Sequence, residues 1–284
     1  MLGYADDGAL LAPSREALQM MLNICCKYFD SHGIKISVND IIKKSKTKCL
    51  AMNVNVVPAN IRLYGKPLPW VDSHIHLGTI INRDGSMDHD LLCKRGEFIG
   101  KVHSLRQELG DQSPDVFMRL VNIYLTSMYG SNTWDLFGLA ARKLFISWNV
   151  LVRNTFNLPL ATPRYILQDI EHGPHLRIQL CKRFVKFYLQ LKNNIKPEVR
   201  HLFNIQKYDV RSNFGRNCQY LCNELNSSNI ENINTTEIVM PIKTPEVEKW
   251  RVPFLRDLLE MRNGVPCEIN RYEIDTFINY VCSR

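Results

Sequence analysis

The segment that decides the fold is Met1-Leu2-Gly3-Tyr4-Ala5-Asp6-Asp7-Gly8-Ala9-Leu10-Leu11-Ala12, at the amino terminus of a chain of 284 residues. Two adjacent aspartates stand between short apolar runs, which is typical of a β-hairpin whose second strand enters a core. Carboxylate oxygens are the ligands that Mg²⁺ prefers, and a site with few protein ligands leaves room for substrate phosphates. The segment therefore predicts a hairpin that carries a magnesium site for phosphoryl transfer at Asp6 and Asp7.

The composition predicts an intracellular protein that folds and binds a polyanion. Lysine and arginine number 36 against 28 acidic residues, so the net charge is +8, the sign that favours phosphate backbones. A hydrophobic content of 45% can fill a core. The nine cysteines are odd in number and form no C-x-x-C pair. Reduced thiols in the nucleus or cytoplasm, and not a secreted protein, are therefore expected.

Zinc and a membrane span are not expected. Cys218 and Cys222 lie one helical turn apart with no histidine nearby, which does not make a zinc site. No signal peptide is expected, because the first residues lack both a basic region and an apolar core. The most apolar stretch, 144–160, is interrupted by Asn149 and Arg153 and falls short of a membrane span. It predicts a buried helix instead.

The pattern along the chain changes near Ser86. Before it, a helix capped by Ser14 and ended by Gly33 precedes strands expected at 34–38, 49–54, 61–64 and 74–77. After it, the spacing of apolar residues predicts only helices, over 88–109, 115–129, 139–156, 163–171, 175–193, 197–206 and 213–225. Residues 226–244 are expected to form a linker, followed by two short helices.

The first segment resembles motif C of reverse transcriptases, in which an aromatic residue, a variable residue and two aspartates lie at the tip of a palm-domain hairpin. The order of the following landmarks is similar to that of non-LTR (LINE-type, jockey-like) retrotransposon polymerases, and five landmarks in order are more specific than one short motif. These landmarks are Ala9 to Ser14, the helix with Leu18 and Leu22, Ser31 to Lys35, Lys46 to Cys49, and Leu77-Gly78.

The resemblance implies two-metal nucleotidyl transfer by an RNA-directed DNA polymerase, with an RNA template and a DNA primer as partners. In this family the first aspartate of the pair works with a third carboxylate on an earlier palm strand to hold two Mg²⁺ ions about 3.5 to 4 Å apart. That carboxylate is not among the residues of this chain. We therefore expect a carboxyl-terminal fragment beginning at motif C, with weak or absent Mg²⁺ binding and no activity alone.

Two further site assignments come from the resemblance. The lysine-rich loop after Ile36 is similar to motif D, whose basic residue neutralises the triphosphate, and Lys46 is the candidate, with Lys44 as the alternative. A solvated loop without a catalytic role is the competing interpretation. His76-Leu77-Gly78 occupies the place of the primer grip, where glycine permits close approach of another backbone. Histidine replaces the aromatic residue that the family usually has there.

The implied fold is α+β: a truncated palm of hairpin, helix and small antiparallel sheet over 1–86, an all-α thumb-like region over 87–157, and a helical tail over 158–284. Two clusters of cations are candidates for phosphate contact. They are Lys94, Arg95, Lys101 and Arg106 in the thumb-like region, and Lys182, Arg183 and Lys186 in the tail. A charged helix face is often only solvated, so a non-catalytic nucleic-acid-binding module and a helical interaction module remain alternatives. The oligomeric state stays open.

Overall fold

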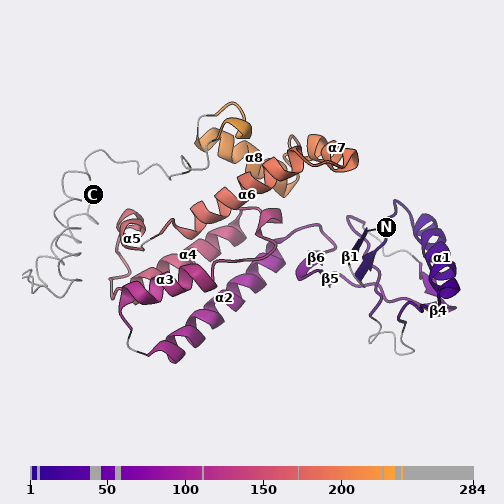
Figure 1. Cartoon of the computed structure of the whole chain (residues 1–284), viewed down its shortest axis with the longest axis horizontal. Coiled ribbons are helices and arrows are strands. Elements are labelled where there is room, and N and C mark those ends of the chain that lie inside the picture. Colours follow the sequence, from indigo (N-terminus) through magenta and orange to yellow (C-terminus); the bar gives the residue numbers. More distant parts are fainter. Residues whose placement is uncertain are drawn as a thin grey trace, which may run out of the picture. The chain divides into compact units, whose positions relative to one another are not determined.

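The computed structural model describes residues 2–4, 7–38, 46–54, 59–110, 112–171, 173–225, 227–233 and 238 (Figure 1). It divides into two compact units, Met1–Asp90 and Leu91–Arg284. The described part is α+β, as expected, with three two-stranded antiparallel sheets in the first unit and helices dominating the second. The division falls within the first turn of α2, close to the boundary expected at 86.

The amino-terminal hairpin pairs β1 (Leu2–Tyr4) with β2 (Asp7–Ala9). The register sets Leu2 opposite Ala9 and Tyr4 opposite Asp7. The helix α1 (Arg15–Ser31) follows, and its Ser14 cap accepts a hydrogen bond from the backbone N–H of Ala17 at 3.2 Å. Gly33, just past the end, has a φ of 71°, so the expected start and stop of this helix are confirmed.

Two more hairpins complete the sheets of the first unit. The strands β3 (Arg62–Leu63) and β4 (Lys66–Pro67) are joined by Tyr64-Gly65, and β5 (Ser73–His76) and β6 (Thr79–Asn82) by Leu77-Gly78. Both two-residue loops have positive φ at both positions, 51° and 77° in the first, 47° and 75° in the second. These values are typical of type I′ turns, which match the twist of the flanking strands.

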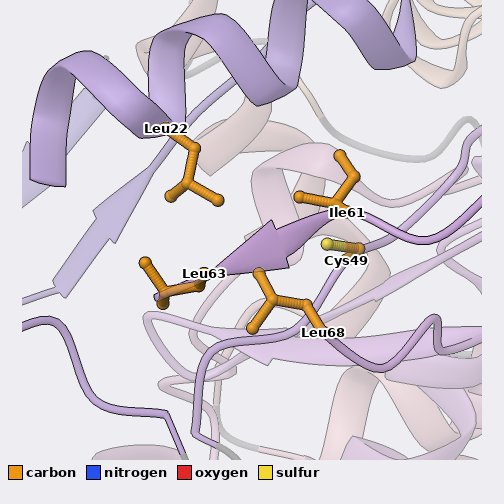
Figure 2. Packing of buried hydrophobic residues seen from close by; sticks show 5 residues of the cluster. All are labelled: Leu22, Cys49, Ile61, Leu63 and Leu68. Carbon is orange, nitrogen blue, oxygen red and sulfur yellow. The ribbon is translucent and has the colours of Figure 1, made fainter. Parts of the chain in front are cut away.

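The core of the first unit lies between α1 and the segments that follow it. Figure 2 shows its buried members, which come from α1, from the hairpin of β3 and β4 with its flanking residues, and from the segment before that hairpin. Those members are Leu22, Cys49, Ile61, Leu63 and Leu68. Leu10, directly after β2, packs against this cluster together with Ile36 and Val38. Burial of these side chains fixes the amino-terminal hairpin to the rest of the unit.

The strands expected at 34–38 and 49–54 do not form. At 34–38, Ile36 and Val38 pack against the core whereas Ile34 is exposed, and the backbone finds other partners. The N–H of Ile36 donates to the Tyr64 hydroxyl at 3.4 Å, and Thr47 donates to the carbonyl of Ser37 at 2.6 Å. At 49–54 one isolated parallel bridge joins Cys49 to Trp70. The N–H of Asn53 donates to the carbonyl of Arg83 at 2.9 Å, so the segment is held by separate backbone bonds and not by a continuous ladder.

The second unit contains the predicted helices close to their expected bounds, except that the helix expected over 115–129 ends five residues earlier, at Tyr124. They are α2 (Asp88–Leu109), α3 (Pro114–Tyr124), α4 (Leu139–Thr155), α5 (Arg164–Ile170), α6 (Leu176–Lys192), α7 (Pro197–Gln206) and α8 (Asn213–Glu224), with short 3₁₀ turns η2 (Ser131–Thr133) and η3 (Ile230–Asn232). The expected thumb-like and tail regions fall within one compact unit. The two closing helices expected at the carboxyl end lie outside the described residues.

The core of the second unit forms around α4 and α6. One side of α4 belongs to the core, since Ala141, Trp148 and Val152 are buried and Phe145 is half-buried. In α6 the buried Phe184 joins an aromatic cluster with α7 and α8. Within the described part of the chain, no helix is both long and apolar enough to cross a lipid bilayer.

Candidate functional site

The hairpin that carries the aspartate pair is present. Asp7 begins β2 and is exposed, whereas Asp6 lies outside the described residues. The returning strand ends at Ala9, earlier than the apolar run to Ala12 predicted, because Leu10 turns into the core. An exposed carboxylate at the end of a short strand fits a site in which water and phosphate complete the coordination of Mg²⁺.

The segment expected as a primer grip is also a hairpin. His76 is the last residue of β5 and pairs with Thr79 across the Leu77-Gly78 turn. Leu77 has a φ of 47°, which a residue with a branched side chain rarely adopts. Such strained positions cluster where a ligand or partner chain is held, so the turn is a candidate contact as well as a connection.

A charge on the first hairpin influences a titrating group on the third. His74 lies on β5 and is half-buried, and burial is the first cause that lowers the pKa of its imidazole. The positive charges of Lys48 and His76 lower that pKa further, and the carboxylate of Asp7 opposes them. The charges of Lys48, His76 and Asp7 therefore all influence the pKa of His74.

A lysine that the sequence did not single out influences this site, and the assignment of Lys46 stays a prediction. Lys46 is exposed and Lys44 lies outside the described residues, whereas Lys48 acts on His74. An apolar Cys49 in an extended segment is a sequence signal for the orientation of Lys48, because neighbouring side chains in such a segment face opposite sides and Cys49 is buried. With Cys49 in the core, Lys48 faces outward.

The described residues do not complete a metal centre. No three histidine, cysteine, aspartate or glutamate side chains gather as ligands within the described ranges, from which Asp6 is missing. His74 and His76 share one face of β5, as expected from their spacing. A second feature of the first unit is an open pocket of about 790 Å³, lined by Asn53, Val54, Asp72, Ser73, Asn82, Arg83, Asp84 and His89.

The four cations expected on α2 differ in their surroundings. Lys94 forms an ion pair with Glu97 at 3.2 Å, and Arg95 donates from Nε to the Ser147 hydroxyl at 2.7 Å. Arg106 lies over the ring of Phe117, with 5.1 Å from Cζ to the ring centroid. Lys101 is exposed. Arg95 and Arg106 thus tie α2 to α4 and α3, which leaves Lys101 as the α2 cation best placed for a phosphate.

The cluster on α6 divides in the same way. Arg183 donates from Nη1 to the carbonyl oxygens of Thr126 and Ser127, the latter at 2.8 Å, and so holds the loop that follows α3. Lys182 is half-buried and Lys186 is exposed. Arg183 therefore has a structural role that the sequence did not reveal, and the two lysines beside it remain available to a ligand.

A buried polar network between α4 and the start of α6 was missed by the sequence. The indole N–H of Trp148 donates to the carboxylate of Glu171, and both side chains are fully buried. His175 contacts Asn149 from Nε2 at 3.1 Å and caps α6 by accepting from the N–H of Arg177. Burial and then the nearby arginines lower the pKa of His175 to about 4, so its ring is neutral at pH 7.

Comparison with known proteins finds no counterpart: no family model, no curated protein and no solved structure matches this chain.

Proposed function

We propose that this chain carries the carboxyl-terminal part of a reverse transcriptase palm, with the Asp6-Asp7 hairpin as its metal site and the Leu77-Gly78 hairpin as its primer grip. The proposal is supported by the presence of both hairpins in one compact unit, where the carboxylate of Asp7 opposes the lowering of the pKa of His74 on β5. A primer end must meet both elements at once, so their presence in one compact unit is what this function requires.

The chemistry divides between the metal and the chain. Bound Mg²⁺ supplies activation of the primer hydroxyl and stabilisation of the leaving pyrophosphate. Asp6 and Asp7 would hold the metal, and Lys48, with His74 beside it, would face the negative charge of the incoming triphosphate. The family that the hairpin resembles uses a third carboxylate together with this pair, so Asp6 and Asp7 by themselves would hold the metal weakly. We therefore propose that the chain alone binds template and primer without extending the primer.

Photocrosslinking of the primer end tests this arrangement. The purified chain is mixed with an RNA template and a DNA primer that ends in a photoreactive nucleotide, with and without Mn²⁺, and crosslinked peptides are identified by mass spectrometry. We expect crosslinks in residues 1–9 and 73–82, strengthened by Mn²⁺. The double variant Asp6→Asn with Asp7→Asn should lose the effect of Mn²⁺, whereas Asp88→Asn, an exposed aspartate in the same unit, should keep it.

Crosslinks scattered over other segments, or the same Mn²⁺ effect in both variants, would contradict the proposed site. Primer extension by the 284-residue chain with Mg²⁺ or Mn²⁺ would contradict the expected inactivity.

A non-catalytic nucleic-acid-binding module is the second candidate, favoured by the exposed Lys101 and Lys186. A filter-binding titration across salt separates it from a purely helical interaction module. Each phosphate contact adds to the salt dependence of affinity, so a slope near zero would exclude any phosphate-binding role.

A further inference from the structure

The loop that follows α3 displays two tyrosines on the surface of the second unit. Tyr124 ends α3 and Tyr129 lies in the loop, and the two residues are 66% and 64% exposed. Thr126 and Met128, between them, are 4% and 6% exposed. The loop is therefore anchored in the core at two positions while both aromatic rings stay in solvent, where they are available to a partner.

Several contacts fix the backbone beneath these rings. The guanidinium of Arg183 donates to the carbonyls of Thr126 and Ser127, and the Thr126 hydroxyl donates to the carbonyl of Asn122 at 2.7 Å. Met128 has a φ of 32°, a value that a side chain of this size adopts only when its surroundings impose it. Tyr124 and Tyr129 thus stand on a preorganised support, which lowers the entropic cost of binding.

Cations lie on the two helices that adjoin this support. Lys186 lies three residues after Arg183, on the same side of α6, whereas Lys182 directly precedes Arg183 and is half-buried. Lys186 is exposed, and so is Arg119 on α3. Aromatic rings interleaved with cations are the surface that unpaired bases and their phosphates recognise.

We propose that Tyr124 and Tyr129 form a stacking platform for unpaired bases of a single-stranded nucleic acid, whose phosphates meet Lys182, Lys186 and Arg119. The proposal rests on the proposed function, because a template has unpaired bases beyond the primer. The net charge of +8 of the chain favours an anionic ligand such as a nucleic acid. Stacking is insensitive to base identity, so the platform reads strand state and not sequence.

Binding of the full chain to labelled oligo-dT and oligo-rU of about 15 nucleotides, followed by fluorescence anisotropy, tests the platform. The double variant Tyr124→Ala with Tyr129→Ala should lose about tenfold or more in affinity at an unchanged salt slope. The double variant Tyr124→Phe with Tyr129→Phe should keep its affinity, since the rings remain. Tyr208→Ala, at a tyrosine 78% exposed in the same unit, is the matched control and should bind normally.

The cations have a separate readout. Lys186→Gln should reduce the salt slope by about one contact, roughly 0.7 in log units for a single strand. We expect similar affinities for the two oligonucleotides, because a stacking surface does not distinguish ribose from deoxyribose. A clear preference for one of them identifies the kind of strand that is bound. It supports the platform if the alanine double variant still loses affinity for that strand.

Two outcomes overturn the platform: equal affinities of the alanine double variant and Tyr208→Ala, or no salt-dependent binding of either oligonucleotide. Both outcomes can be distinguished from failure of the proposed function, because that function is tested separately by the crosslinks of the primer end to the first unit. Retained crosslinks with unaffected single-strand affinity remove the platform alone. Loss of those crosslinks with a normal tyrosine effect removes the proposed function alone.

Discussion

His175 Nε2 and Asn149 Oδ1 lie 3.1 Å apart inside the second unit, and this contact defines the protonation state of the histidine. Nδ1 accepts the N–H of Arg177, so Nε2 carries the proton that is donated to Asn149. An added proton would have to displace the Arg177 contact next to an arginine side chain and in a desolvated site. The neutral ring is therefore part of the native structure.

The first prediction concerns pH. The folded pKa of His175 is about 4 against 6.5 for the free side chain, so the unfolded chain binds the extra proton more tightly between these values. The contribution of the neutral ring is fully present above about pH 6.5 and is lost as the pH falls towards 4, a change on the order of 3 kcal/mol. Urea unfolding of the wild type from pH 4 to 7 should follow this decline.

The control for this prediction is His175→Asn, which retains a residue favoured at the N-cap of α6 and removes the titrating group. Its free energy of unfolding should vary less over the same pH range than that of the wild type. Parallel curves for the two proteins would show that another group causes the decline.

The second prediction concerns Arg183, whose guanidinium satisfies the carbonyls of Thr126 and Ser127. Arg183→Met should lower the free energy of unfolding by about 1 to 3 kcal/mol, because the buried carbonyl of Thr126 loses its partner. Lys186→Met, on the same helix and exposed, should change it little. Thermal unfolding monitored by circular dichroism measures both, and equal shifts would argue against the anchoring role.

The helices could be predicted from the sequence because their signals are local. The Ser14 cap, the Gly33 stop and the apolar spacing of α2 to α8 lie within the elements themselves. The strands expected at 34–38 and 49–54 failed because a strand depends on a partner far along the chain. The hairpins of the candidate site could likewise be recognised from local sequence. The influence of Lys48 on the pKa of His74 could not, because it depends on how distant segments pack together.

Buried polar pairs were equally beyond the sequence. In the sequence, Asn149 interrupts an apolar stretch, and this argued only against a membrane span. No neighbouring residue indicated that Asn149 contacts His175. The Trp148 and Glu171 pair is likewise formed between two elements that meet only in the folded unit. In the sequence, Arg183 belongs to a charged cluster. Only the structure shows that its guanidinium donates to the backbone carbonyls of Thr126 and Ser127.

The third prediction concerns backbone strain in the Leu77-Gly78 turn. Asparagine tolerates positive φ far better than leucine, so Leu77→Asn should stabilise the first unit by about 1 kcal/mol. Tyr64→Asn relieves a similar φ of 51°, but it also loses the hydrogen bond from the tyrosine hydroxyl to Asp30 at 2.9 Å. Chemical denaturation should therefore show a gain for the first variant and no gain for the second. A loss for Leu77→Asn would mean that the leucine side chain stabilises the unit by more than the strain costs.

The last prediction tests the approach of the two hairpins without any ligand. Burial lowers the pKa of His74 first, Lys48 lowers it further, and Asp7 opposes both. Removing the positive charge in Lys48→Gln should therefore raise the pKa of His74, and removing the negative charge in Asp7→Asn should lower it, because each change reverses one Coulombic contribution. Lys46→Gln, at an exposed lysine two residues away, should leave it unchanged. The measurement is an NMR titration of the His74 ring in each variant, at low ionic strength so that screening does not hide the effect. Shifts of opposite sign in the first two variants would require Asp7 and Lys48 to lie near the same imidazole, whereas identical titrations in all of them would separate the aspartate hairpin from β5 and remove the geometric basis for a shared primer site.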